Sequence, residues 1–190
     1  MIVPTHRLIA HYVYNYIQLK AGISLDKKWF TFGNVLPDVN PYYIKRKHFY
    51  CVSFDYVISL INSLENDMDR ISMKEFSLRL GIISHYVSDF FCYPHNDRAY
   101  FKGRLKEHMQ YEYKLHGSFS SIAKWHICDT SFYDLDETQI INSFRKIYLQ
   151  EGMCIKNDIK FTLDAVSAIG LSLSEAYVEG LDTAVGIAHI

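Results

Sequence analysis

The sequence has no Cys-x-x-Cys pair, no hydrophobic run long enough to cross a membrane, and no basic start followed by an apolar stretch. The first absence argues against a zinc ribbon, and the wide spacing of the cysteines argues against a disulfide framework. The other two argue against a transmembrane helix and a signal peptide. As given, the chain is therefore expected to be cytoplasmic, unless a leader has been removed. We expect four reduced core thiols: Cys51, Cys92, Cys128 and Cys154.

Positive charge is not in excess either. The chain has 20 Lys and Arg against 21 Asp and Glu, a net charge of −1, so it has no basic field that would attract duplex nucleic acid. A hydrophobic content of 49%, with 15 Tyr and 12 Phe, predicts a folded chain. We find no strand-like alternation, no repeat and no low-complexity segment. The sequence therefore predicts a single all-α domain spanning residues 1–190.

Apolar residues at helical spacing predict about six to seven helices. Thr5 is expected to cap the first helix and Gly22 to end it. Ser72, with Glu75 three residues later, is expected to start the third helix, and Pro94 to end it. The expected helices span residues 4–21, 51–66, 72–93, 104–116, 134–151 and 155–181, with 23–50 irregular, 118–132 mixed and 181–190 a short tail.

The most informative stretch, residues 80–112, contains two pairs of His and an acidic residue four positions apart, His85 with Asp89 and His108 with Glu112. Residues four apart share a helix face, and their side chains are zinc-type ligands. About one such pair is expected by chance from 9 His and 21 acidic residues in 190, so the count alone is weak. His85 and Asp89 also lie in an apolar run, where burial without partners is costly. From these two residues, a metal and a His–Asp hydrogen bond without an ion both remain open.

Several polar residues outside this stretch are further candidates. Asp38 follows Pro37 in a turn-rich segment and suits either a helix cap or a carboxylate aimed into a site. The basic run 45–47 is typical of a solvated surface, although beside a metal it would attract phosphate. His6 is a ligand candidate, and His116 continues the face of the second pair but suits a helix end. We expect surface positions for His11, His126 and His189.

Taken in order, the ligand-type residues form a series: Thr5-His6, Gly33-x-x-x-Pro37-Asp38, His48, His85-x-x-x-Asp89, His95 and His108-x-x-x-Glu112. This series resembles the zinc-dependent phospholipase C family, whose fold is shared by single-strand-cleaving zinc nucleases. The order matches across residues 5–112, a little over half of the chain. The remaining predicted helices suit the all-α fold of that family.

The resemblance implies a buried cluster of two or three zinc ions. One zinc would be held by Asp38, His48, His85 and Asp89, a second by His95, His108 and Glu112, and a third by Asp89, His6 and the amino terminus. Such ions clamp a phosphodiester, neutralise its charge and lower the pKa of bound water to about 7. The resemblance also implies that Asp38 orients the attacking water or acts as general base, the alternative being a plain ligand.

The implied activity is hydrolysis of a phospholipid, or another phosphodiester, by metal-activated water. Choline specificity is not implied, because Val39 and Lys45 stand where the best-known members carry aromatic residues, although Tyr42 and Phe49 are close in sequence. Secreted members of the family exist, and contact with a membrane surface stays open. Two alternatives remain: a single-strand nuclease or phosphatase on the same scaffold, and a non-catalytic protein whose zinc only holds the helices together.

Overall fold

Helices make up all of the regular structure in the part of the chain that the structure describes. This computed structural model describes residues 1–97, 101–129, 131–132 and 135–187, without the side chains of 182–187. The helices in these ranges are α1 (Val3–Ala21), α2 (Lys27–Val39), α3 (Pro41–Ile44), α4 (Tyr50–Asp67), α5 (Met73–Asp89), α6 (Tyr93–Asn96), α8 (Leu105–Ala123), α9 (Glu137–Glu151) and α10 (Ile155–Ile187). The predicted all-α class is confirmed. The predicted count of six to seven helices is too low, because α2 and the two four-residue helices were not anticipated.

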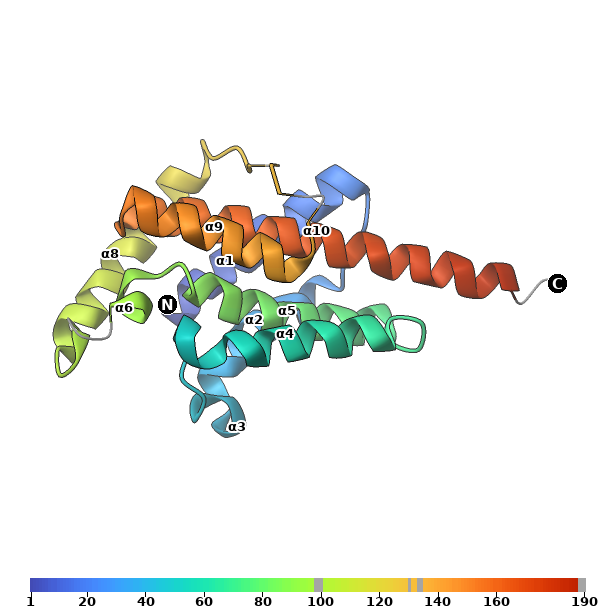
Figure 1. The fold of residues 1–190 in the computed structure, drawn as a ribbon, viewed down its shortest axis with the longest axis horizontal. Coiled ribbons are helices and arrows are strands. Elements are labelled where there is room, and N and C mark those ends of the chain that lie inside the picture. Colours follow the sequence, from blue (N-terminus) through green and yellow to red (C-terminus); the bar gives the residue numbers. More distant parts are fainter. Residues whose placement is uncertain (98–100, 130, 133–134, 188–190) are drawn as a thin grey trace.

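The long helix α10 runs through the bundle and contacts α1, α5, α8 and α9 (Figure 1). Its inward face is apolar over several turns, and the buried residues there include Ile159, Leu163, Val166, Ile169 and Leu173. Helices α2 and α4 pack on α5, and α4 also contacts α9. None of the described helices combines the length and apolar character needed to cross a membrane.

Helices α2 and α5 approach each other unusually closely, and two glycines make this possible. A Cβ on Gly81 would lie 2.4 Å from the Phe30 carbonyl oxygen and 2.9 Å from the Gly33 Cα, and a Cβ on Gly33 would lie 2.2 Å from the Leu78 carbonyl oxygen. Such separations are far below van der Waals contact, so neither position has room for a side chain. The contact fixes the end of α2 against the end of α5, where the candidate site residues lie.

The sequence prediction that residues 23–50 are irregular is wrong. Asp26 caps α2 by accepting a hydrogen bond from the Trp29 backbone N–H (3.2 Å), and Gly33 lies inside the helix rather than in a turn. Pro37 occupies the last turn of α2. Turn propensity is overridden here because packing against α5 stabilises the helix. Asp38 is therefore not a cap, and it is Asn40 that caps α3, through the Tyr42 N–H (2.9 Å).

Other helix boundaries are partly as predicted. Gly22 ends α1 with a φ of 68°, and Ser72 caps α5 by accepting from the Glu75 N–H (3.2 Å), as predicted. The predicted Thr5 cap is wrong, because α1 begins at Val3 and the Thr5 side chain is buried. The third predicted helix, α5, ends at Asp89 rather than at residue 93. A short connection then leads into α6, which contains Pro94. Helix α8 continues to Ala123, and α10 replaces the expected tail as far as Ile187.

Predictions for single residues also need correction. Cys92 and Cys128 are buried as expected, whereas Cys51 and Cys154 are exposed. His126 is not an ordinary surface residue, because its Nε2 lies 2.7 Å from a carboxylate oxygen of buried Asp164. His11 is exposed as predicted, and His189 lies outside the described residues. His116 lies within α8 rather than at its end, with its Nδ1 3.2 Å from the Thr5 hydroxyl.

Replacing Gly81 with Ala is expected to lower the free energy of unfolding by about 1–3 kcal/mol, because the added Cβ would force α2 and α5 apart. Gly117→Ala is the matched control, since Gly117 is an exposed position inside α8 with open space around it. That variant should gain about 0.5–1 kcal/mol from helix propensity. Denaturant unfolding followed by circular dichroism would measure both. Equal effects of the two substitutions would contradict the close-contact interpretation.

Candidate metal centre

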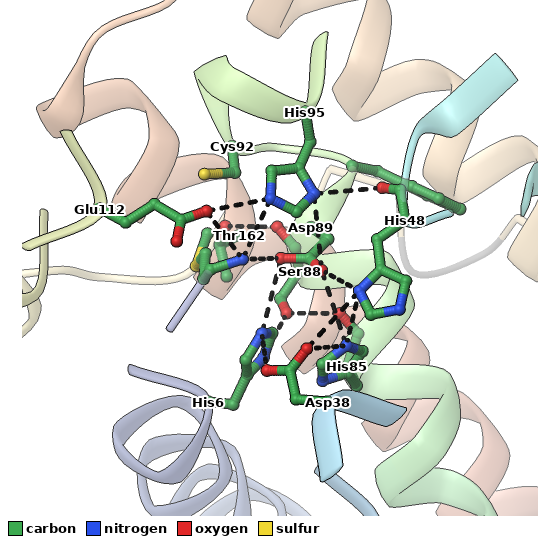
Figure 2. A network of polar contacts seen from close by, with 12 residues as sticks. His6, Asp38, His48, His85, Ser88, Asp89, Cys92, His95, Glu112 and Thr162 are labelled. Carbon is green, nitrogen blue, oxygen red and sulfur yellow. Dashed lines mark hydrogen bonds and ion pairs between the residues drawn. The ribbon is translucent and has the colours of Figure 1, made fainter. Parts of the chain in front are cut away.

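The structure brings all eight predicted site residues into one cluster (Figure 2). They come from six separate segments of the chain: His6 from α1, Asp38 from the last turn of α2, His48 from the connection between α3 and α4, His85 and Asp89 from α5, His95 from α6, and His108 and Glu112 from α8. The two pairs spaced four apart lie on single faces of α5 and α8, as the helical spacing predicted.

The floor of the cluster consists of His6, His85 and Asp89, whose side chains are all fully buried. The His6 and His85 rings stack with centroids 3.9 Å apart. Both rings approach Asp89 without reaching hydrogen-bond distance, at 3.5 Å from His6 Nε2 and 3.6 Å from His85 Nε2. The alternative of a simple His85–Asp89 hydrogen bond is therefore not what the structure shows.

Hydrogen bonds on the outer side of each floor imidazole fix its orientation. His85 Nδ1 donates to the Asn34 carbonyl oxygen (2.9 Å), which leaves Nε2 as the acceptor that faces the cluster. The Ser88 hydroxyl donates to the His85 carbonyl oxygen (2.7 Å), so it accepts from His6 Nδ1 (3.2 Å). His6 Nε2 then faces the inside of the cluster, toward Asp38 and Asp89. Orientation of a ligating ring through its second nitrogen is the usual outer support of a metal-binding histidine.

A second group lies around Glu112 on α8. Its Oε1 is 3.0 Å from His95 Nε2 and 2.9 Å from His108 Nε2. The Cys92 sulfur belongs to this group as well, because it lies within 4.8 Å of the donor atoms of His95 and Glu112. Sequence reasoning missed Cys92. No motif marked it, apart from its position three residues before His95.

The amino group of Met1 lies between the two groups. It forms an ion pair with Asp89 and lies 3.4 Å from Glu112 Oε1 and 3.3 Å from His95 Nε2. Burial alone would lower the pKa of this amino group, but the two neighbouring carboxylates outweigh burial and raise the pKa to about 12. In the absence of a metal, the ammonium therefore offsets part of the negative charge of the site.

The electrostatic environment keeps Asp89 ionised and His85 neutral, which are the forms that bind metals. Burial alone would raise the pKa of Asp89, but His95, the Met1 ammonium and His6 lower it to well below its usual range. Burial and the nearby His6 hold the pKa of His85 well below its usual value, so this imidazole is neutral. Metals bind ionised carboxylates and neutral imidazoles. Asp38 differs, because burial raises its pKa.

The donor set fits a cluster of metal ions. His6 Nε2 is buried and has no hydrogen-bond partner, although it points between Asp38 and Asp89. Three sets of ligand atoms each lie within 4.8 Å of one another: His6, His85 and Asp89; Asp38, His48 and His85; and Cys92, His95 and Glu112. So many buried carboxylates and lone-pair nitrogens would be costly without cations between them.

The chemical environment of the rim differs from that of the floor. The side chains of Asp38, His48 and His108 are 21%, 12% and 23% exposed, whereas the floor side chains are fully buried. His116 lies two turns beyond His108 on α8 and belongs to none of the three donor sets. The cluster is thus closed on the helix side and reachable by solvent at Asp38, His48 and His108.

Buried Asp158 of α10 is hydrogen-bonded to three of the segments around the cluster. Its carboxylate accepts from the Tyr93 N–H (2.8 Å), the Tyr111 hydroxyl (2.9 Å) and the Tyr148 hydroxyl (2.8 Å). These bonds tie the start of α6, the middle of α8 and the end of α9 to α10. Burial raises the pKa of Asp158 to about 6 despite these three donors.

An all-α bundle that gathers histidines and carboxylates into one cluster presents the donor types that zinc proteins use. The family model for zinc-dependent phospholipase C matches residues 5–155, which is well over half of the chain. The protein therefore belongs to the zinc-dependent phospholipase C family. Comparisons with curated proteins and with solved structures gave no match.

Replacing His85 with Asn is expected to remove at least one zinc ion per chain, because His85 belongs to two of the three donor sets. His11→Asn is the matched control, since His11 is exposed and bonds only to Asn15 among the described contacts. Elemental analysis of purified, zinc-loaded protein would count the ions. An unchanged zinc content in a folded His85 variant would show that the cluster does not hold metal as described.

Proposed function

We propose that this protein hydrolyses a phosphodiester bond in phospholipids, releasing a phosphorylated headgroup and diacylglycerol. Family membership supports a zinc-dependent, phospholipase-like activity. The proposed ligands follow the donor sets and the family resemblance. One zinc would be held by Asp38, His48, His85 and Asp89, a second by His95, His108 and Glu112, and a third by His6, Asp89 and the Met1 amino group.

The observation that carries this proposal is the contrast between a buried floor and a partly exposed rim. A structural zinc site is closed by protein ligands, whereas a catalytic site keeps a position open to water and substrate. Asp38 and His48 are partly exposed, whereas the floor residue Asp89, which also contacts His48, is fully buried. This arrangement favours a catalytic centre over a purely structural one.

Within such a centre the chain's own residues have distinct tasks. When bound, zinc ions would neutralise the negative charge of the phosphodiester and lower the pKa of water. Asp38 is the most exposed carboxylate of the cluster, and burial raises its pKa toward the range of an effective base. We assign it to orient the attacking water and take its proton. His85, whose orientation is fixed by its hydrogen bond to the Asn34 carbonyl oxygen, lies next to Asp38 with its Nε2 3.7 Å from Oδ1.

The segment that joins Asp38 to His48 supports a lipid substrate. It exposes Tyr42, at 71% of its surface, together with Val39 and Ile44. Exposed Lys45 and Lys47 follow directly. In Figure 1 this segment, around α3, projects from the helical bundle. Apolar side chains next to basic ones are suited to a phospholipid surface, where the former contact acyl chains and the latter contact phosphates.

Zinc-loaded protein is expected to release a phosphorylated headgroup from phospholipid, and chelation should abolish the reaction. Asp38→Asn should lower kcat by about 100- to 10,000-fold, because the amide cannot accept the proton. Asp69→Asn is the matched control, since Asp69 is an exposed residue whose recorded partner is Arg70. A headgroup-release assay would measure both variants.

The same preparation would be tested for cleavage of single-stranded DNA and for hydrolysis of a phosphate monoester. Faster turnover on either substrate than on phospholipid would replace the lipid assignment with a nuclease or phosphatase. Inactivity on all three substrates, with zinc retained, would leave a structural metal cluster and refute a catalytic role.

The double substitution Tyr42→Ser and Ile44→Ser is expected to reduce hydrolysis of phospholipid vesicles at least several-fold. Hydrolysis of a soluble short-chain phospholipid should stay nearly unchanged, because the substitutions remove contact with a membrane rather than ligands. Leu19→Ser is the control, as Leu19 is an exposed apolar residue near the end of α1. Equal losses on vesicles and on soluble lipid would contradict a role of this segment in surface contact.

A further inference from the structure

A second group of ligand-type side chains lies outside the cluster described above. It consists of His126 and Cys128, from the irregular segment after α8, and Asp164 of α10. Their donor atoms lie within 4.8 Å of one another, and Cys128 and Asp164 are buried. Asp164 lies beyond residues 5–155, so this group is not contained in the segment that the family model matches.

The carboxylate of Asp164 is only half satisfied. Its Oδ1 accepts from His126 Nε2 (2.7 Å) and from the Asp129 backbone N–H (3.0 Å). Its Oδ2 is buried and has no hydrogen-bond partner, in a side chain that is 1% exposed. A buried carboxylate oxygen without a partner costs about 1–3 kcal/mol or more. The unpartnered oxygen is therefore available as a ligand atom.

The backbone holds His126 and Cys128 side by side. The two residues are separated by one position in a stretch without helix, and their donor atoms lie within 4.8 Å of each other and of an Asp164 oxygen. The Tyr12 hydroxyl of α1 lies 3.4 Å from the His126 carbonyl oxygen and 3.6 Å from the Cys128 sulfur. Contacts from α1 and α10 therefore hold both side chains beside Asp164, and a bound ion would replace the proton that His126 Nε2 donates to Asp164 Oδ1.

We propose that His126, Cys128 and Asp164 bind one zinc ion, separate from the main cluster. An imidazole nitrogen, a thiolate and a carboxylate oxygen are zinc ligands, and three protein ligands leave a fourth position for solvent. Of the three ligands, only His126 lines the surface pocket that it shares with Trp125, Lys156 and Lys160. The ion would tie the segment that follows α8 to α10.

Binding of Co²⁺ tests this site, because only a thiolate ligand gives a sulfur-to-cobalt charge-transfer band. The proposed ligands of the main cluster contain no cysteine, so the band would report on Cys128. The metal-free protein, residues 1–190, would be loaded with Co²⁺, and the bound metal would be counted by elemental analysis. Cys128→Ser and Asp164→Asn should each bind about one ion fewer than the wild-type protein, and Cys128→Ser should lose the band. Circular dichroism would verify that both variants are folded.

The other three cysteines provide matched controls. Cys51→Ser and Cys154→Ser change exposed thiols and should leave the band and the metal count unchanged. Cys92→Ser is needed because the Cys92 sulfur lies beside His95 and Glu112 in the main cluster. A band that survives in Cys92→Ser supports the proposed site. A band that is absent from Cys92→Ser, or unchanged in Cys128→Ser, overturns it.

Discussion

The arrangement of the site depends on one buried carboxylate, that of Asp89. It forms an ion pair with the Met1 amino group and lies 2.9 Å from His48 Nδ1, with the nearest nitrogens of His6, His85 and His95 at 3.5 to 3.6 Å. A fully buried carboxylate is stable only when positive charge or hydrogen-bond donors surround it. The segments that supply the Met1 amino group and the histidines therefore pack against the end of α5. The same concentration of negative charge and lone pairs is what makes the position suitable for divalent cations.

The helical frame holds these segments at the required spacing. Gly33 and Gly81 allow α2 and α5 to touch through their backbones, which brings Asp38 near His85. On the opposite side, Asp158 ties α6, α8 and α9 to α10 through three hydrogen bonds, so that His95 and Glu112 meet. Rigid helices thus carry the floor of the cluster, while the exposed connection around α3 lies next to its open side. This division is typical of a site that must bind ions firmly and still admit a substrate.

The residues that the sequence singled out lie together in the structure, and they could be singled out because they occur as helical pairs and in a fixed order along the chain. Sequence reasoning placed α2 in a loop, since Gly33 and Pro37 are turn-forming residues whose helical state depends on packing with α5. It also dismissed His126 as a surface residue. Its partner Asp164 is 38 positions away, and no local pattern connects the two.

The sequence alone indicated the fold class, the family and the types of ligand that the chain offers. Periodic apolar residues specified helices, and the types and spacing of His, Asp and Glu indicated zinc-type ligands and the family. Only the tertiary structure decided which donors converge, which are buried and which remain open to solvent. The physical reason is that burial and convergence arise from contacts between segments far apart in the chain, such as Gly33 with Gly81 and Met1 with Asp89. Such contacts leave no periodic signal in the residues that make them.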